Sequence, residues 1–336
     1  MAVLQPFSLL VKPVGSACNL RCHYCFYSDH AAGTMEPALF RRLLDSYLAL
    51  PFAAKSIALQ GGEPLLAPPA ILAALDASPL EKSIQTNGTL LTPALARRFA
   101  DERWLVGVSL DGPRELNRLR GDSFDAAVRG IRALEAAGVD YNLLTVVSQA
   151  NVRHAVHVYR YLRDTFATRY HQYIECTGPC DAIDGDAWGA FLVELFDAWI
   201  EADAHTVSIR LFDSLVSQMV RGVPTQCSAA SSCRQYLVVE HDGSVYPCDF
   251  HVRADLKLGN IQTHTWEEML DAKIYRDFAA AKTIALPPAC RTCEFFRFCH
   301  GDCPRHRARF CAGLKKFFAH ALPRFRELAA ECSRPF

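Results

Sequence analysis

The sequence lacks an excess of charge of either sign, because its 36 acidic residues are balanced by 36 lysines and arginines in a chain of 336 residues. This balance gives no electrostatic reason to expect a nucleic-acid partner. Long apolar runs are also missing, since no stretch approaches the roughly eighteen residues of a membrane-spanning helix. Residues 1–10 lack the basic start and long apolar core of an export signal. We therefore expect a cytoplasmic protein with no membrane partner.

Cysteine is missing from the middle of the chain and concentrated at its two ends. Of the 14 cysteines, none lies between residues 26 and 175, whereas three lie at 18–25, three at 227–248 and five at 290–311. Cytoplasmic thiols are kept reduced, so closely spaced cysteines there are more often metal ligands than disulfides. The distribution predicts metal-binding regions near the start of the chain and in its C-terminal third.

The first group consists of Cys18, Cys22 and Cys25, in a short loop that follows an apolar run. A [4Fe–4S] cluster normally has four cysteine ligands. Three thiolates would therefore leave one iron open to a small-molecule ligand. The alternative is a zinc ion whose four-ligand shell is completed by His23 or His30 from the same loop.

Strands and helices alternate along the first two thirds of the chain. Apolar segments predict strands, and amphipathic segments between them predict helices. The predicted strands are 8–12, 56–60, 82–86, 104–110, 141–147 and 170–175, and the predicted helices are 37–49, 93–102, 124–137, 151–166 and 187–202. Because helices connect the strands, the strands should be parallel. Six such units predict an α/β fold with a partial barrel, whose chemistry lies at the carboxyl ends of the strands.

Two segments at the end of the barrel have no place in these six units. Residues 176–186 predict a polar loop that faces the substrate as a lid, or else an ordinary connection. A further strand and helix within 206–221 are expected to lead out of the barrel.

The C-terminal third holds eight more candidate ligands. Residues 235–241 and 244–246 predict a hairpin, because Asp242-Gly243 suits a tight turn with positive φ. The hairpin would bring Cys233 close to Cys248. Eight thiolates satisfy two closed [4Fe–4S] clusters or two zinc sites. The eight are Cys227, Cys233, Cys248, Cys290, Cys293, Cys299, Cys303 and Cys311.

The first cysteine group, with Tyr24 before its last member, and the later Gly-Gly-Glu-Pro sequence resemble the radical S-adenosylmethionine (SAM) enzymes. This resemblance implies a TIM-like (β/α)6 barrel and a cluster whose open iron is chelated by SAM. The reduced cluster of that family cleaves SAM to a 5′-deoxyadenosyl radical. The cofactor contacts implied for this chain are Tyr24, Gln60, Gly61, Gly62, Glu63, Ser109 and Asp111.

The order of the C-terminal cysteines resembles the SPASM extension of peptide- and protein-modifying radical SAM enzymes, which carries two auxiliary [4Fe–4S] clusters. The resemblance implies interleaved ligand sets: Cys227, Cys233, Cys248 and Cys303 for one cluster, and Cys290, Cys293, Cys299 and Cys311 for the other. It divides the chain into a barrel at 1–224, a SPASM domain at 225–312 and a terminal helix at 313–336. Without metal, the SPASM segment should be poorly ordered.

Several segments resemble the anaerobic sulfatase-maturating enzymes in particular. They include Leu10–Pro13, Cys22–Tyr27, Gln60–Pro64, Gln85–Thr89, Val108–Pro113, Tyr246–Phe250 and Leu258–Ile261. This family converts a Cys or Ser of a sulfatase to formylglycine. The resemblance implies that the deoxyadenosyl radical takes a β-hydrogen and that Asp249 removes the side-chain proton. It further implies that an auxiliary cluster accepts an electron and that a flavodoxin or ferredoxin supplies electrons for SAM cleavage.

Two other functions fit the same sequence. Related enzymes with the SPASM extension modify ribosomal peptides by thioether or carbon–carbon crosslinks, and fold alone does not fix function. The second alternative is a zinc-ribbon interaction module in which residues 290–303 bind a partner. The basic run at 305–309 is interpreted as a solvated face or a site for an acidic partner.

Overall fold

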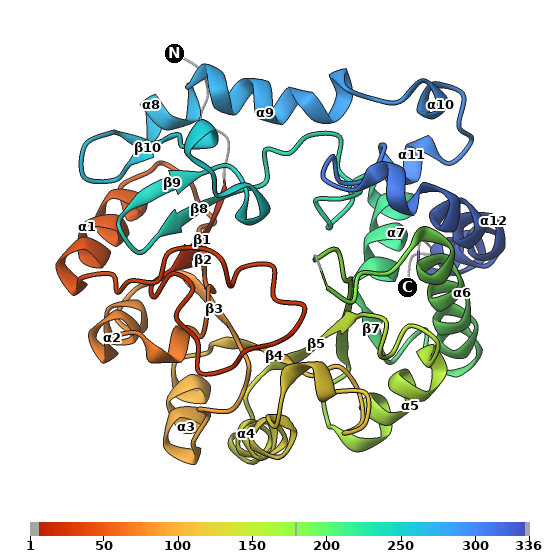
Figure 1. The fold of residues 1–336 in the computed structure, drawn as a ribbon, viewed down its shortest axis with the longest axis horizontal. Helices are drawn as coiled ribbons and strands as arrows, with labels where there is room; N and C mark the ends of the chain where they lie inside the picture. Colours follow the sequence, from red (N-terminus) through yellow and green to blue (C-terminus); the bar gives the residue numbers. More distant parts are fainter. Residues whose placement is uncertain (1–6, 179, 333–336) are drawn as a thin grey trace.

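A single sheet connects the barrel to the C-terminal third of the protein. The computed structural model describes residues 7–178 and 180–332. In the described chain the strand order is β10-β9-β8-β1-β2-β3-β4-β5-β6-β7. Strands β1 to β7 run parallel, and the curved sheet they form carries helices on its outer side (Figure 1). The predicted α/β fold with a partial barrel is therefore confirmed.

The barrel is built from alternating strands and helices, as its sequence predicts. Its strands are β1 (Ser8–Lys12), β2 (Ser56–Leu59), β3 (Glu81–Thr86), β4 (Leu105–Ser109), β5 (Tyr141–Val147), β6 (Tyr170–Glu175) and β7 (Ser208–Ile209). Its helices are α1 (Pro37–Leu48), α2 (Pro69–Asp76), α3 (Pro93–Asp101), α4 (Phe124–Ala137), α5 (Ala155–Thr165), α6 (Gly185–Ala202) and α7 (Arg210–Arg221). Helices α1, α2 and α3 each begin with a proline in the first turn, where a missing N–H costs nothing.

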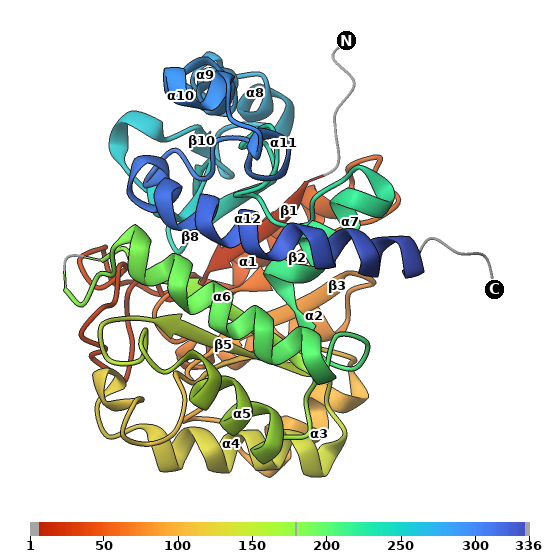
Figure 2. The same cartoon turned by 90° about the vertical axis from the view of Figure 1, so that its right-hand side faces the viewer.

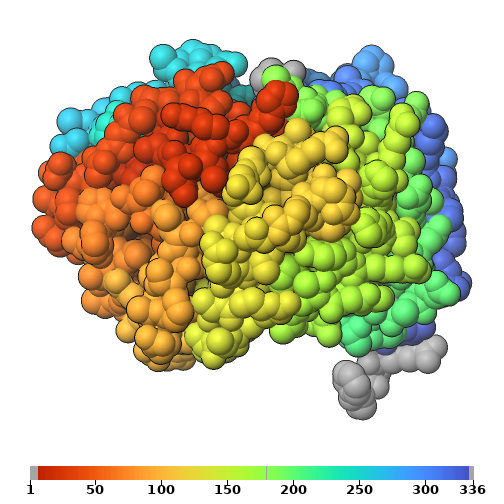
Figure 3. All heavy atoms as spheres, turned by 60° about the horizontal axis from the view of Figure 1, so that its bottom comes forward, coloured from red at the N-terminus to blue at the C-terminus, as the bar shows by residue number. Residues whose placement is uncertain are grey.

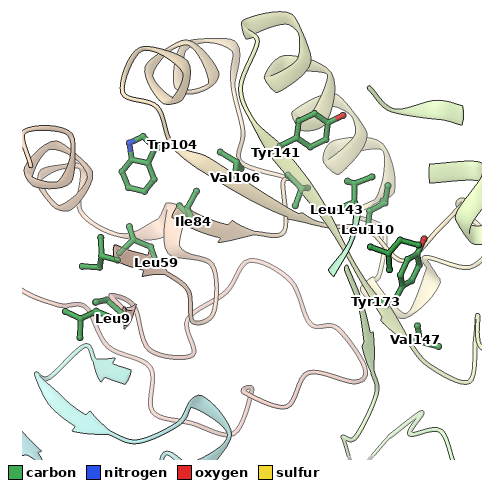
Figure 4. Close-up of a cluster of buried hydrophobic side chains, with 14 of the residues drawn as sticks. Leu9, Leu59, Ile84, Trp104, Val106, Leu110, Tyr141, Leu143, Val147 and Tyr173 are labelled. Atoms are coloured by element: carbon green, nitrogen blue, oxygen red, sulfur yellow. The ribbon is translucent and has the colours of Figure 1, made fainter. Parts of the chain in front are cut away.

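Apolar side chains from neighbouring strands fill the core behind the sheet. Leu9, Leu59, Ile84, Val106 and Leu143, one from each of the first five strands, are fully buried and lie in one cluster (Figure 4). Parallel strands are covered on both faces, so their sequences read as nearly continuous apolar runs. Successive units from the N-terminus onward lie side by side across the outer face (Figure 3).

The β7–α7 unit belongs to the sheet, so the prediction that residues 206–221 leave the barrel is wrong. His171 of β6 pairs in parallel with Ile209 of β7. A two-residue strand leaves little pattern in the sequence, and its pairing follows only from the position of the chain after α6.

The C-terminal third adds its hairpin to the other edge of the same sheet. Strand β8 (Tyr236–Glu240) pairs in parallel with β1, and β9 (Ser244–Tyr246) and β10 (Gly259–Asn260) follow in antiparallel pairing. The helices beyond are α8 (Trp266–Leu270), α9 (Lys273–Ile284), α10 (Pro288–Arg291) and α11 (Phe296–Cys299). The cysteine-rich segment is therefore anchored to the strand that leads into the first cysteine group.

The terminal helix α12 (Arg307–Cys332) starts six residues before the predicted start at residue 313. The expected domain boundary after residue 312 therefore falls inside a helix. Helix α12 runs along α6 (Figure 2), and a Cβ at Gly189 of α6 would lie 2.5 Å from the Cα of Gly313. None of the described helices has the length and apolarity needed to cross a membrane.

Candidate functional site

The first cysteine group lies in the loop between β1 and α1, and the Gly-Gly-Glu-Pro segment holds this loop in place. The Gly62 amide donates a hydrogen bond to the Gly15 carbonyl at 2.7 Å, and the Glu63 amide donates to the Ala17 carbonyl at 2.8 Å. A Cβ at Gly62 would lie 2.0 Å from the Ala17 carbonyl oxygen. Glycine is therefore required at position 62 because another backbone approaches it closely.

The carboxylate of Glu63 is buried and bonded within the protein. It accepts hydrogen bonds from the Thr86 hydroxyl at 2.8 Å and from the amides of Asn87 at 2.8 Å and Leu65 at 3.0 Å. Burial raises the pKa of Glu63, and these hydrogen bonds oppose the rise. In this geometry Glu63 fixes the strand ends around the loop. The side chain of Gln60 donates to Gln85 at 2.7 Å, and Ser109 is half-buried at the end of β4.

The three thiols of the loop lie close enough to affect one another. Cys18 and Cys25 each raise the pKa of Cys22, although burial is the largest cause and Arg120 opposes it. Cys18 also accepts weak hydrogen bonds from the Leu20 amide at 3.3 Å and the Asn87 amide group at 3.7 Å. The structure therefore brings together the three cysteines predicted to hold the SAM-binding cluster.

Two buried charged side chains, Asp111 and Arg120, hold the Tyr24 hydroxyl in place. The hydroxyl donates to Asp111 at 2.5 Å and accepts from Arg120 at 2.8 Å. The second carboxylate oxygen of Asp111 accepts the Val146 amide at 3.0 Å. Asp111, predicted as a cofactor contact, thus connects Tyr24 of the cysteine loop through one oxygen to strand β5 through the other. Arg120 was not among the predicted residues, because nothing in its sequence spacing shows that it meets Tyr24.

The loop after β6 covers the cysteine group. The carboxylate of Asp181 forms a hydrogen bond with His23, and a Cβ at Gly178 would lie 2.9 Å from the Tyr24 carbonyl oxygen. Cys176, buried below this loop, points its sulfur at the Cys180 carbonyl at 3.6 Å. The described residues of the predicted lid segment therefore contact the first cysteine group at His23 and Tyr24.

Within each of the two predicted sets of C-terminal cysteines, the thiols influence one another electrostatically. Burial raises the pKa of Cys227, Cys233 and Cys248, and the nearby thiol of Cys303 adds to the rise in each of the three. In the same way Cys311 and Cys293 affect Cys290, and Cys290 and Cys293 affect Cys299. Burial is the main cause in each case, and it raises the pKa of Cys227 to about 11 and of Cys248 to about 12.

These donors suit iron–sulfur clusters better than single metal ions. Buried thiols with raised pKa become thiolates only beside a strong positive charge, which a metal centre supplies. A zinc ion would draw its thiolates to about 2.3 Å from one point. No group of three His, Cys, Asp or Glu side chains in residues 7–178 and 180–332 is placed to hold one ion. A cluster binds each thiolate at a separate iron and so fits more widely spaced sulfurs.

Asp249 lies between the two cysteine regions. It is 8% exposed and follows Cys248 in a short 3-10 turn (Asp249–His251). The Tyr236 hydroxyl donates to its carboxylate at 2.7 Å. The ring of Phe250 packs on Phe26, which follows Cys25, with centroids 4.6 Å apart. The predicted base therefore adjoins Cys248 of the first auxiliary set, and its neighbour Phe250 packs on the residue that follows the first cysteine group.

A second buried contact joins the barrel to the C-terminal third. Nε2 of His306 lies 3.2 Å from the carboxylate of Glu175 at the end of β6. Burial lowers the pKa of His306, but the Asp302 carboxylate, 3.4 Å from its Nδ1, together with Cys303 and Glu175, raises it to about 10. Burial also raises the pKa of Glu175 to about 7, against the effect of His306. This pair was not predicted, since it depends on the return of the chain to the barrel.

One of the hollows in the described chain borders the site. A cavity of about 290 Å³ is lined by Thr177 of the lid segment and by residues 304–309. The larger, of about 530 Å³, is lined by residues such as Arg163 and Asp203 and contains no cysteine. We therefore associate only the smaller with the cysteine groups.

Within the basic run 305–309, the guanidinium of Arg305 lies over Phe250, 4.3 Å from the ring centroid. Arg307 is buried and donates to the carbonyls of Ala285 and Lys282 at 2.9 and 3.1 Å. The prediction of a solvated face therefore holds for Arg305 and Arg309, which are exposed, and is wrong for Arg307.

Comparisons with known proteins agree with this geometry. Residues 13–162 match the radical SAM superfamily, and residues 227–294 match an iron–sulfur cluster-binding domain called SPASM. The chain is 32% identical to a cysteine-type anaerobic sulfatase-maturating enzyme of Clostridium perfringens (strain 13 / Type A), over 97% of this chain and 99% of the relative. It is 30% identical to a serine-type enzyme of Bacteroides thetaiotaomicron, over 95% and 90%.

A solved structure gives the same result in three dimensions. The structure described as native anSMEcpe with bound AdoMet and Cp18Cys peptide superposes with a TM-score of 0.91 at 31% identity, covering 98% of this chain and 100% of that chain. The likeness extends over the barrel and the cysteine-rich third together. The chain belongs to the anaerobic sulfatase-maturating enzymes, a family of radical SAM proteins with a SPASM domain.

Proposed function

We propose that this protein oxidises a Cys or Ser residue of a target sulfatase to Cα-formylglycine. The observation that carries the proposal is the position of Asp249, a buried carboxylate that adjoins Cys248 and precedes Phe250, whose ring packs on Phe26 beside the first cysteine group. A base at this point can act on a peptide bound beside the SAM site. The similarity to cysteine-type and serine-type maturating enzymes over almost the whole chain supports the same substrate class.

Three [4Fe–4S] clusters and SAM are the cofactors of this proposal. Cys18, Cys22 and Cys25 would hold the SAM-binding cluster in the barrel at 1–224, and the two interleaved sets would hold the auxiliary clusters in 225–312. When bound, the first cluster and SAM supply the radical that removes a β-hydrogen from the target residue. The protein's own residues hold the loop in place through Glu63 and Gly62 and fix Tyr24 through Asp111 and Arg120.

Asp249 would take the side-chain proton of the target Cys or Ser. Its carboxylate is oriented by the Tyr236 hydroxyl, which bonds one oxygen and leaves the other available. A base within hydrogen-bond reach of the reacting group is what general-base catalysis requires. The lid segment over Tyr24, with Asp181 on His23, would limit access of water to the site.

The partners follow from the same proposal. The substrate is a protein or peptide, and electrons come from a low-potential donor such as a flavodoxin or ferredoxin. Reduced thiols and clusters of this kind are stable in the cytoplasm, where we place the protein. We propose neither a nucleic-acid nor a membrane partner.

The test uses anaerobically reconstituted protein with SAM, a reductant and peptides that copy a sulfatase target segment with Cys, Ser or Ala at the target position. We expect about twelve irons per chain, the sum for three cubes. We also expect 5′-deoxyadenosine to form together with an aldehyde product. The Ser peptide should lose two hydrogens. The Cys peptide should lose two hydrogens and exchange its sulfur for an oxygen.

The Ala peptide is the control and should stay unchanged. A crosslinked peptide in place of an aldehyde would support the alternative of ribosomal-peptide modification. Colourless protein that contains zinc and does not cleave SAM would support the zinc-ribbon alternative. Either result would overturn the proposal.

A further inference from the structure

Lys12, the last residue of β1, is buried between the two cysteine regions. Its side chain is 1% exposed, and its ammonium nitrogen lies 3.5 Å from the centroid of the Tyr27 ring and 5.6 Å from that of Phe26. Lys12 pairs in register with Glu240 of β8. Among the residues that the structure describes, none is found to accept a hydrogen bond from the ammonium group. Lysine is almost never fully buried without a compensating charge, so this position requires an explanation.

The charges around Lys12 come from both cysteine regions. Burial lowers the pKa of Lys12, and four acidic groups oppose this effect, namely Asp249, Glu240, Cys248 and Cys25 in decreasing order. Cys25 belongs to the proposed SAM-binding cluster and Cys248 to the first auxiliary set. The carboxylate of Glu240 is held by the Tyr27 hydroxyl at 2.5 and 2.6 Å. The ammonium therefore lies at the junction of barrel and hairpin, over Phe26, which follows Cys25 and packs on Phe250, two residues after Cys248.

We propose that Lys12 is a positioning residue that supplies one positive charge to two cluster sites, at Cys18–Cys25 and at Cys227, Cys233, Cys248 and Cys303, and so raises the reduction potentials of both. This inference depends on one part of the proposed function, namely that these two sites bind clusters. The potential of an iron–sulfur cluster depends on the net charge and hydrogen bonds around it. Charges in a buried region interact more strongly than in water. Each cluster gains negative charge on reduction, so a nearby cation favours the reduced state.

A second buried lysine provides a matched control. Lys282 of α9 is 0% exposed and donates to the carbonyls of Cys227 at 2.8 Å and Ser228 at 2.6 Å. The thiols that affect its pKa are Cys233, Cys227 and Cys303, all from the first auxiliary set. Removal of the Lys282 charge should therefore affect one cluster, whereas removal of the Lys12 charge should affect two.

The experiment is a redox titration, followed by electron paramagnetic resonance, of anaerobically reconstituted wild type, Lys12→Met, Lys12→Arg and Lys282→Met, without peptide. Addition of SAM identifies the signal of the SAM-binding cluster. At equal iron content we expect Lys12→Met to shift two potentials to more negative values, Lys282→Met to shift one, and Lys12→Arg to stay near wild type. The cluster at Cys290, Cys293, Cys299 and Cys311 is the internal reference and should not move.

Unchanged potentials in Lys12→Met at full iron content would overturn the inference, and so would a shift of equal size in Lys12→Arg. If Lys12→Met fails to load iron, Glu240→Gln replaces it. Loss of this neighbouring negative charge should shift the same two potentials to less negative values, and no shift would again overturn the inference. If the wild type holds clusters and cleaves SAM but the variants have unchanged potentials, the inference fails while the proposed function stands. A wild type without clusters would remove the proposed function itself.

Discussion

At the scale of single residues, Asp249 carries the proposed proton transfer. It is buried beside Cys248, and Tyr236 orients its carboxylate. We expect Asp249→Asn to keep about twelve irons and to cleave SAM, because asparagine has a similar shape and does not disturb the cysteines. Product formation should fall by about 10²–10⁴-fold, the usual contribution of a general base. Iron analysis, 5′-deoxyadenosine and peptide mass are measured in the same reaction.

Asp255→Asn is the matched control for this prediction. Asp255 lies six residues further on, is exposed, and forms an ion pair with Arg253 at 2.6 Å. This control should make product at the wild-type rate, since exposed ion pairs contribute little. Full product yield from Asp249→Asn would remove Asp249 from the mechanism.

His171 should make the folded protein sensitive to mild acid. It is buried on β6, neither ring nitrogen has a hydrogen-bond partner among the residues that the structure describes, and burial lowers its pKa to about 4. The folded pKa is below the value of about 6.5 in an unfolded chain, so the unfolded state binds the proton first. Stability is therefore complete above about pH 6.5 and is lost as the pH falls toward 4. We expect a loss of about 2 kcal/mol between pH 7 and pH 5 from this group.

Anaerobic urea unfolding of wild type and His171→Leu at the two pH values measures this term. The Leu variant cannot take up the proton, so its loss of stability between pH 7 and pH 5 should be smaller by the stated amount. An identical pH dependence in both proteins would contradict the prediction.

At the scale of elements, the packing of α12 on α6 depends on glycines. A Cβ at Gly313 would lie 1.7 Å from the Gly185 carbonyl oxygen and 2.8 Å from the Gly189 amide nitrogen. Alanine favours a helix by about 1 kcal/mol over glycine, but the two backbones would have to separate. We expect Gly313→Ala to destabilise the protein by about 1–3 kcal/mol, as other overpacked cores are destabilised.

The same substitution should loosen one cluster, because α12 also carries Cys311 near Cys290. Iron content and thermal midpoint are compared with those of Lys315→Ala, a change at an exposed position of the same helix. A stable Gly313→Ala variant with full iron content would show that the helices can separate without cost.

The alternation of elements was predictable, whereas several of their contacts were not. Apolar runs and helix starts at prolines follow from local patterns. Strand β8 pairs with β1 more than 200 residues away in sequence, and no pattern in either strand specifies that partner. Helix α2 has no predicted counterpart, because its start at Pro68-Pro69 resembles a turn and it spans 8 residues. Helix α12 begins early because Arg307 is fixed by the carbonyls of Ala285 and Lys282.

The candidate site was likewise predictable from the sequence in some of its parts and not in others. Cysteine spacing indicated the three thiol groups, and the structure brings the same residues together, although their roles as ligands remain a prediction. The sequence did not indicate the roles of Arg120 and Lys12, because each acts on groups that are distant in sequence. Glu63 and Asp111 were predicted from motifs, and the structure shows that their oxygens bond other parts of the protein.

At the scale of the whole molecule, the shared sheet determines which parts of the C-terminal third depend on metal. Residues 236–240 form a parallel ladder with β1 over five positions, from Ser8↔Tyr236 to Lys12↔Glu240. Strand pairing and the buried Leu237 and Val239 hold this hairpin without any metal. In contrast, residues 288–304 contain two four-residue helices and four of the cysteines. The expectation that the segment is poorly ordered without metal stays a prediction, and we expect it to apply to residues 288–304 rather than to the hairpin.

We predict that anaerobic removal of iron by a chelator loosens the C-terminal third selectively. Hydrogen exchange followed by mass spectrometry should show nearly unchanged protection at residues 236–246 and a large loss at 288–304, because metal ligation stabilises ligand-bearing loops. Helix α3, which lies on the barrel far from any cysteine in sequence, is the reference. Equal loss of protection in β8 and in residues 288–304 would mean that the clusters, rather than the sheet, hold the hairpin on the barrel. In that case the position of Asp249 relative to the first cysteine group would itself depend on the auxiliary clusters.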